Sequence, residues 1–202
     1  MKIICIARNY SEHAKELNNE IPEKPVFFLK PDTAILLKGR DFYIPEFSSN
    51  VHYECEIVLK IKKPGKYIQP QFASNYFEEI TLGIDFTARD IQNELKSKGH
   101  PWEISKAFDG SAVVGKFYSK NEFNLENISF QLLKNNEIVQ NGNSQDMINN
   151  FNDIIAEVSK YFTLKTGDLV FTGTPAGVGQ VIENDQLAGI LEGKKVFDIS
   201  VK

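Results

Sequence analysis

The sequence predicts a mainly β protein of the α+β class that forms one domain over residues 1–202. Apolar and polar residues alternate with the period of two that is typical of half-buried strands, and few segments have helical spacing. The length lies within the range of roughly 150–250 residues that single β-rich domains occupy. The chain contains no repeat, low-complexity tract or linker that would divide it. We therefore expect a domain dominated by strands, with a few short helices.

The first half of the chain predicts strands around two helices. We expect strands in KIICIA, KPVFFLKPDTAIL, VHYECEIVLKI and EITLGIDF, the second of them interrupted by Pro31. The polar segment RNYSEHAKELNNE predicts a short helix that Asn9 or Ser11 caps. A second helix is predicted in TARDIQNELKSKG, with Thr87 as its cap and Gly99 at its end.

The second half predicts further strands and one longer helix. We expect strands in AVVGKFY, ISFQLLKNNEIVQNG and DLVFTGTP, and a last strand in the tail KKVFDISVK. Asn135 and Asn136 stand between two apolar runs, which indicates a hairpin turn. The longer helix is predicted in SQDMINNFNDIIAEVSKYF, where apolar residues recur with helical spacing.

Composition argues against several classes of protein. Hydrophobic residues make up 42% of the chain and charged residues 25%, which is ordinary for a globular protein. The net charge of −4 offers no broad attraction for nucleic acid or for an anionic membrane. No apolar run approaches the ~20 residues of a membrane-spanning helix and no signal-peptide pattern is present, so we expect a cytoplasmic protein. Cys5 and Cys55 lie in apolar segments and predict buried, reduced thiols.

Three carboxylates invite a functional interpretation. Glu54 and Glu56 share one face of a predicted strand, because successive side chains of a strand point to opposite sides. That face is either a solvated outer surface or the wall of a cavity that holds a cation. Asp85 ends an apolar strand, either as a turn residue or as a buried carboxylate that needs a partner. Three oxygen ligands without a His or Cys cluster suit Mg²⁺ or Mn²⁺.

Six ordered motifs carry a resemblance to a known family. The motifs are RNYSEHAKE, FLKPDTA, HYECEI, GIDFTARDIQ, GHPWEISKAFDG and FTGTPAGVG. In their order and spacing the chain resembles the fumarylacetoacetate hydrolase family from about residue 3 to the C-terminus, most closely its short, single-domain branch of acylpyruvate hydrolases and oxaloacetate decarboxylases. The resemblance implies that family's mixed β-roll or sandwich, a homodimer and a small 2-oxo acid as substrate.

The resemblance also implies which residues form the site, in three groups. They are Glu54, Glu56 and Asp85 as ligands of Mg²⁺ or Mn²⁺, His13, Glu16 and Lys106 as catalytic residues, and Lys30, Arg89, Gln92 and Thr174 as substrate contacts.

Some of these residues have ordinary interpretations as well. His13 and Glu16 lie three residues apart on a predicted helix, which suits a surface ion pair. Lys106 stands near Trp and Phe, which suits a lysine whose stem covers aromatic surface. In the family, however, the His–Glu pair is a dyad on a mobile N-terminal helix that closes over the substrate. We therefore expect Glu16 to orient the His13 imidazole, which activates water.

Two positions depart from the family pattern, and neither removes a matched ligand or acid/base residue. Residue 7 is Ala where relatives often have Gly. The run FDGSAVVG replaces a segment that usually contains Pro after the lysine. We expect both departures to alter the shape of the pocket.

We expect a metal-dependent hydrolase that cleaves a C–C bond of a small acylpyruvate, of the fumarylpyruvate or acetylpyruvate type. The leaving fragment is the enolate of pyruvate, which the cation and Lys106 stabilise. The same electrostatic site serves two alternatives, an oxaloacetate decarboxylase or tautomerase and a 2-hydroxyhepta-2,4-diene-1,7-dioate isomerase. A protein of a different class, which binds metal and a 2-oxo acid without catalysis, stays open because family membership does not establish activity.

Overall fold

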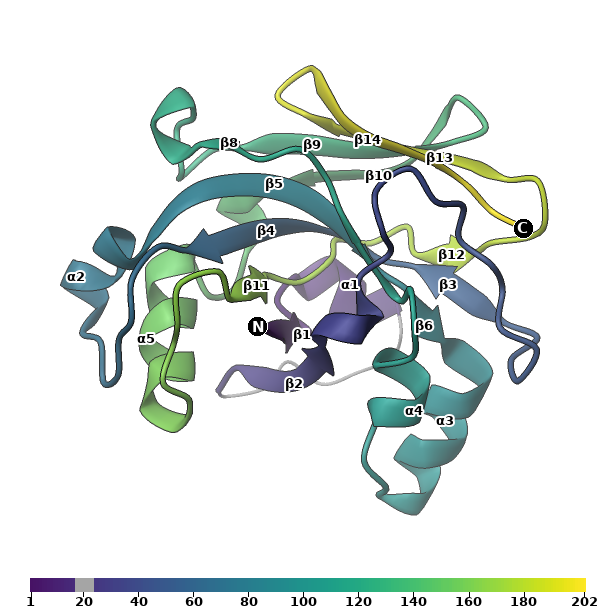
Figure 1. Cartoon of the computed structure of the whole chain (residues 1–202), viewed down its shortest axis with the longest axis horizontal. Coiled ribbons are helices and arrows are strands. Elements are labelled where there is room, and N and C mark those ends of the chain that lie inside the picture. The colour runs from purple at the N-terminus through teal and green to yellow at the C-terminus, as the bar shows by residue number, and fades with distance from the viewer. Residues whose placement is uncertain (17–23) are drawn as a thin grey trace.

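The computed structural model of the protein describes residues 1–16 and 24–202. Within these ranges the strands form three sheets, which confirms the expected α+β class (Figure 1). The largest sheet has seven strands in the order β2-β1-β11-β4-β5-β7, with β8 paired to β5. Only β1 and β11 run parallel in it. Its strands are β1 (Lys2–Ala7), β2 (Val26–Pro31), β4 (Cys55–Ile61), β5 (Phe77–Asp85), β7 (Ala112–Val114), β8 (Tyr118–Ser119) and β11 (Leu169–Phe171).

Two smaller sheets complete the architecture. The four-stranded sheet has the order β10-β9-β13-β14 and lies over β4 and β5, while the three-stranded sheet has the order β12-β3-β6 (Figure 1). Their strands are β3 (Val51–Tyr53), β6 (Thr87–Ala88), β9 (Ser129–Lys134), β10 (Glu137–Asn143), β12 (Gly179–Gln180), β13 (Gln186–Leu191) and β14 (Lys194–Ser200).

The core lies where the two larger sheets face each other. Buried side chains of β4 and β5 belong to one apolar cluster with side chains of β9 and β13. Each Leu, Ile or Phe buried there contributes about 1.5–3 kcal/mol relative to an exposed position. Members from the four strands include Ile57, Leu82, Phe130, Leu132 and Leu187.

Short helices lie around the sheets. Figure 1 shows α3 and α4 at one end of the molecule and α2 with α5 at the other, with α1 between them. Asn150 caps α5, since its Oδ1 accepts the backbone N–H groups of Asn152 and Asp153. The helices are α1 (Ser11–Glu16), α2 (Pro70–Ala73), α3 (Arg89–Lys98), α4 (Glu103–Lys106) and α5 (Phe151–Tyr161).

Several local predictions are confirmed. Asn135 and Asn136 have φ angles of 53° and 69°, which is the left-handed conformation that a tight hairpin turn needs. Gly99 ends α3 with a φ of 65°. The chain leaves β2 at Pro31, as predicted. Both cysteines are buried and unpaired with each other. No helix in the described ranges is long and apolar enough to cross a membrane.

Two local predictions about helices need correction, and a third is confirmed in part. Thr87 does not cap α3, because it belongs to β6 and pairs with His52 of β3. The longer helix starts only at Phe151, and the residues before it form a 3₁₀ turn at Ser144–Asp146 and a connecting segment. The predicted helix in residues 8–20 is present at Ser11–Glu16, and its remaining part, residues 17–20, lies outside the described residues.

The segment at 51–61 is two strands rather than one. β3 pairs with β6 and β12, whereas β4 pairs with β5 and β11, so the chain passes from one sheet to another at Glu54. Glu54 and Glu56 are only 5% and 2% exposed, so a solvated outer face is excluded. This junction between sheets is where the candidate site lies.

Candidate active site

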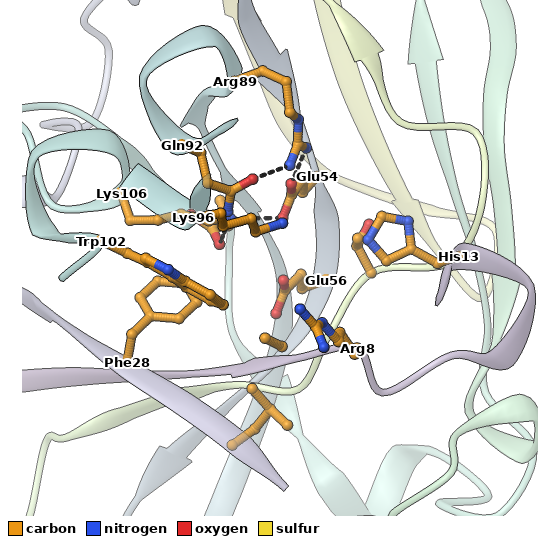
Figure 2. A pocket seen from close by; sticks show the side chains of 14 residues that line it. Arg8, His13, Phe28, Glu54, Glu56, Arg89, Gln92, Lys96, Trp102 and Lys106 are labelled. Carbon is orange, nitrogen blue, oxygen red and sulfur yellow. Dashed lines mark hydrogen bonds and ion pairs between the residues drawn. The ribbon is translucent and has the colours of Figure 1, made fainter. Parts of the chain in front are cut away.

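A polar pocket opens beside the ends of β4 and β5. Figure 2 shows side chains of α3 on one side of it and Arg8 with His13 on the other. It contains about 410 Å³ of empty space, part of which is open solvent. The residues that line it are Ile6, Ala7, Arg8, His13, Phe28, Glu54, Glu56, Asp85, Arg89, Gln92, Lys96, Trp102, Lys106 and Thr174.

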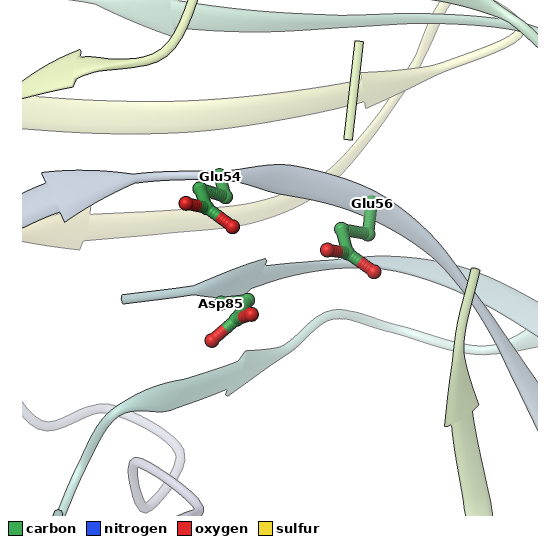
Figure 3. A group of neighbouring side chains, drawn as sticks. All are labelled: Glu54, Glu56 and Asp85. Carbon is green, nitrogen blue, oxygen red and sulfur yellow. The ribbon is translucent and has the colours of Figure 1, made fainter. Parts of the chain in front are cut away.

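Three buried carboxylates converge at the bottom of this pocket (Figure 3). One ligand oxygen from each of Glu54, Glu56 and Asp85 lies within 4.8 Å of the others. The antiparallel register of β4 and β5 brings Asp85 beside Glu54, since Cys55 pairs with Ile84 and the Asp85 N–H donates to the Glu54 carbonyl at 2.8 Å. Residues 31 positions apart in the chain thus share one point in space.

Two of these carboxylates have cationic partners. Glu54 accepts from the Arg89 guanidinium and from Lys106 Nζ, the latter at 2.8 Å. Asp85 lies 2.7 Å from Lys106 Nζ and 2.6 Å from Lys30 Nζ. Burial alone raises the pKa of Glu54, but Lys106 and Arg89 hold it well below its usual range. Glu54 is therefore an anion in the folded protein.

Glu56 differs from its two neighbours. In the described parts of the chain its only hydrogen bond comes from the Gly173 backbone N–H, at 2.7 Å, and it has no ion-pair partner. Burial and the nearby Asp85 carboxylate raise the pKa of Glu56 well above its ordinary value. A buried carboxyl that ionises at such a cost needs a cation to compensate it.

This donor set fits a divalent cation. Glu56 lacks a positive partner, and the buried Asp85 Oδ1 accepts no hydrogen bond although Lys30 is close to it. The cluster offers carboxylate oxygens without sulfur or imidazole, which is the ligand chemistry of Mg²⁺ and Mn²⁺. Glu54, Glu56 and Asp85 are thus the residues that would hold such an ion.

Basic side chains surround the carboxylates. Lys106 is 3% exposed, and its Nζ also donates to the Thr87 hydroxyl at 2.6 Å and lies 5.1 Å from the centre of the Phe28 ring. Burial lowers the pKa of Lys106, but Asp85 and Glu54 raise it to a net value above normal, so the ammonium stays charged. Lys30 is not among the pocket-lining residues, because it lies behind Asp85 and donates to Ser111.

Arg89 and Gln92 lie on the pocket face of α3. Both side chains are buried, and Arg89 Nη1 donates to Gln92 Oε1 at 2.5 Å. Because the Gln92 oxygen faces Arg89, the NH₂ group of the same amide points away from Arg89. Because Arg89 also contacts Glu54, the helix places a charged and an amide group next to the metal ligands.

His13 and Glu16 lie together on α1. His13 is 6% exposed and lines the pocket, with its Nδ1 3.2 Å from Glu16 Oε2. The other Glu16 oxygen accepts the Gly177 N–H at 3.0 Å, which ties α1 to the loop after β11. Glu16 therefore orients the imidazole and leaves its Nε2 as the nitrogen that can exchange a proton.

Thr174 follows β11 and also lines the pocket. It is 3% exposed, and its Oγ1 accepts a hydrogen bond from Gln140 Nε2 at 2.8 Å. Of the ten site residues expected from the sequence, eight line this one pocket. The other two, Glu16 and Lys30, contact the pocket-lining His13 and Asp85.

Four further side chains with hydrogen-bond donors lie at this site and were not expected from the sequence. Lys96 follows Arg89 and Gln92 by seven and four positions, so helical spacing alone places it on the same face. Arg8 lies within a quoted motif and has a left-handed φ of 57°, which is uncommon outside glycine. Trp102 also lies in a quoted motif, with its ring 5.5 Å from Lys96 Nζ. Gln140 has no local signal in the sequence.

Comparison with known proteins identifies relatives over almost the whole chain. The family model described as fumarylacetoacetate (FAA) hydrolase C-terminal matches residues 2–199. The chain is 38% identical over 192 residues to a mitochondrial oxaloacetate tautomerase of Bos taurus, covering 95% of this chain and 87% of that protein. It is 41% identical over 182 residues to a mitochondrial oxaloacetate decarboxylase of Dictyostelium discoideum, covering 89% and 84%.

A solved structure shares the fold. The fumarylpyruvate hydrolase of Pseudomonas aeruginosa, in complex with Mn²⁺ and pyruvate, superposes with a TM-score of 0.94. The two chains are 33% identical, and the match covers all of this chain and 89% of the other.

Proposed function

This chain belongs to the fumarylacetoacetate hydrolase family, and from that premise we propose that it is a divalent-metal-dependent enzyme for small 2-oxo acids. We propose interconversion of the enol and keto forms of oxaloacetate as its reaction. The observation that carries this proposal is the excess of positive charge around a pocket that also contains an oriented imidazole.

Among the described residues, five basic side chains stand around three carboxylates. The excess over these three carboxylates is two positive charges, and it is one when the Glu16 carboxylate beside His13 is counted. A divalent ion would add two more, which favours a small ligand with more than one negative charge. Oxaloacetate carries two carboxylates at neutral pH, and its enolate carries one charge more. The basic residues are Arg8, Lys30, Arg89, Lys96 and Lys106, and the acidic ones are Glu54, Glu56 and Asp85.

The residues of the chain supply the rest of the chemistry. Glu54, Glu56 and Asp85 would hold a divalent ion, which would supply Lewis-acid chemistry toward the 2-oxo group. His13, oriented by Glu16, would give or take the proton at C3 of the substrate through Nε2. Lys106 keeps a positive charge beside the oxygen at C2, which becomes anionic in the enolate.

The relatives support oxaloacetate as the first substrate to test. Both curated relatives reported above are named for reactions of oxaloacetate. Decarboxylation of oxaloacetate proceeds through the enolate of pyruvate, so the same site would serve it. The homodimer and the cytoplasmic location expected from the sequence stay predictions.

Hydrolysis of an acylpyruvate, the first expectation from the sequence, is the second candidate. The structural relative named fumarylpyruvate hydrolase favours it, as does an imidazole with a carboxylate partner that could activate water. It needs room for an attacking water and for the acyl group, which tautomerisation does not.

A substrate panel separates these candidates. The purified protein is assayed with Mg²⁺ and with Mn²⁺ for loss of enol-oxaloacetate absorbance, for pyruvate release from oxaloacetate, and for cleavage of acetylpyruvate and fumarylpyruvate. We expect enol–keto conversion to be the fastest reaction and to stop when EDTA is added. Faster acylpyruvate cleavage would transfer the assignment to the second candidate. Full activity in metal-free protein would contradict both, and binding without any turnover would indicate a non-catalytic protein.

A further inference from the structure

Gln140 connects two segments of the pocket wall, the start of β4 at Cys55 and the loop that carries Thr174, from a different sheet. It lies on β10, in the four-stranded sheet, and is 1% exposed. Its Oε1 accepts the backbone N–H of Cys55 at 2.9 Å, and Cys55 stands between Glu54 and Glu56. Its Nε2 donates to Thr174 Oγ1 at 2.8 Å and to the Pro175 carbonyl at 3.0 Å.

The orientation of this amide follows from its partners. A backbone N–H can only donate and a backbone carbonyl can only accept. The oxygen of Gln140 must therefore face Cys55, and its NH₂ group must face Pro175 and Thr174. Rotating the amide by 180° would place its NH₂ group against the Cys55 N–H, which is also a donor. It would place its oxygen against the Pro175 carbonyl, which is also an acceptor.

This orientation fixes the role of the Thr174 hydroxyl. Because Thr174 Oγ1 accepts from Gln140, its own O–H hydrogen has to be directed to another acceptor. Within residues 1–16 and 24–202 that hydroxyl donates to no protein acceptor, while Thr174 lines the pocket at 3% exposure. The hydroxyl is therefore available as a donor for a ligand in the pocket.

The backbone around Gln140 is shaped to allow this contact. The pairing of β10 with β9 shifts register between Ile138 and Gln140. On the other side, Gly177 has a φ of 95°, and a Cβ there would lie 2.3 Å from the Val139 carbonyl oxygen. Only glycine lets the loop that carries Thr174 lie this close to β10.

We propose that Gln140 is a positioning residue that makes the Thr174 hydroxyl a hydrogen-bond donor for a carboxylate of the substrate. The inference rests on the proposed function for the chemical class of the ligand. It adds a residue that touches neither substrate nor metal, yet determines the direction of one substrate contact.

The test is the variant Gln140→Glu, measured as oxalate affinity at saturating Mn²⁺ by calorimetry. An ionised Glu keeps the shape and the bond to the Cys55 N–H but has no hydrogen to donate, so Thr174 turns its O–H toward the new carboxylate. We expect oxalate affinity to fall about tenfold, with no loss of Mn²⁺ affinity. In turnover, KM should rise more than kcat falls. Unchanged oxalate affinity would overturn the proposal.

A double-mutant cycle shows whether Gln140 acts through Thr174. In a Thr174→Val background, which has no hydroxyl, Gln140→Glu should lower oxalate affinity by less than about twofold. Full additivity of the two losses would overturn the proposal. Gln186→Glu, an exposed position on β13 of the same sheet, is the matched control for the added charge and should bind oxalate as the wild type does.

Two variants of Thr174, to Ser and to Val, test the proposal even where Gln140→Glu does not fold. Thr174→Ser keeps a hydroxyl beneath Gln140 and should bind oxalate within about threefold of the wild type, whereas Thr174→Val should lose about tenfold. Equal affinity of the two variants would overturn the proposal. Wild-type protein that binds oxalate but converts no 2-oxo acid would contradict the proposed function alone. Wild-type protein that binds no oxalate with Mn²⁺ would contradict both.

Discussion

The two sides of the pocket are built in different ways. The carboxylate side lies on strands of the seven-stranded sheet and at its junction with β3, where strand register holds Glu54 and Asp85 together. Buried basic side chains connect these carboxylates further. The other side is the six-residue helix α1, which carries His13, the proposed acid/base residue. The proposed metal ligands are thus preorganised, while the imidazole proposed to move protons stands on a short helix.

Among the described residues, hydrogen bonds of two side chains, Asn9 and Glu16, connect α1 to the rest of the molecule. Before the helix, the fully buried Asn9 donates to the carbonyls of Asn149 and Thr172 and accepts the Asn149 N–H. At its end, Glu16 accepts the Gly177 N–H in an exposed bond. Because the two sides are held separately, substitutions on them should affect binding and turnover separately.

The largest effect is expected on the carboxylate side, from Glu56→Gln. Loss of this ligand should lower Mn²⁺ affinity at least about 100-fold and abolish turnover, because replacing outer-shell partners alone costs about 10–100-fold. Mn²⁺ binding is followed by calorimetry. Glu79→Gln, on the outer end of β5, is the matched control. A Glu56→Gln protein that retains Mn²⁺ affinity would show that the three carboxylates do not share one ion.

The same variant should stabilise the metal-free protein at neutral pH. The raised pKa of Glu56 means that the folded state binds this proton more tightly than the unfolded chain. The stability that this proton contributes is therefore fully present below the ordinary carboxyl pKa of about 4.3. It is lost as the pH rises through the pKa of Glu56 in the folded protein. Gln carries no such penalty, so with EDTA at pH 7 we expect a gain of about 1 kcal/mol or more, which disappears near pH 4. Urea unfolding at both pH values measures it.

The next largest effect is expected on the helix side, from His13→Ala. Loss of the acid/base group should lower kcat by about 10²–10⁴, while oxalate affinity with Mn²⁺ stays within about twofold because the binding groups are untouched. If the dyad also activates water, cleavage of an acylpyruvate should suffer more than decarboxylation of oxaloacetate. His100→Ala, at an exposed position after α3, serves as control. A comparable loss of oxalate affinity would show that the two sides are not separable.

The smallest effect concerns the pH dependence of Lys96, which faces Arg8, Arg89, Glu54 and Lys106. Burial, followed by the charges of Arg89 and Arg8, lowers the pKa of Lys96 to about 8. Its charge is full below that pH and is lost above it, so kcat/KM for oxaloacetate should fall several-fold between about pH 7 and 9.

Lys96→Arg should remove this alkaline fall, because a guanidinium stays charged over the whole range. The pH profiles of kcat/KM for the wild type and the variant measure the difference. Lys98→Arg, on the exposed side of α3, should leave the wild-type profile unchanged. Persistence of the alkaline fall in Lys96→Arg would assign it to another group.

Some turns, one helix end and the fold class of this protein could be predicted from short segments of its sequence. The hairpin at Asn135 and Asn136 and the helix end at Gly99 depend on backbone conformations that short segments determine by themselves. The α+β class follows from the periodicity of apolar residues. Glu54, Glu56 and Asp85 were visible as three carboxylates on strand-forming segments, where a cation site was one of two interpretations. The resemblance of the surrounding motifs favoured that interpretation over a solvated face.

Only the tertiary structure decided where these groups meet. Thr87 looks like a helix cap in sequence, but pairing with β3 places it in a strand, where its hydroxyl accepts from Lys106. Lys30 lies behind Asp85, and Gln140 reaches the pocket from a separate sheet. The physical reason is that backbone sterics and periodicity act within a few residues, whereas the register between strands brings together side chains that are tens of residues apart.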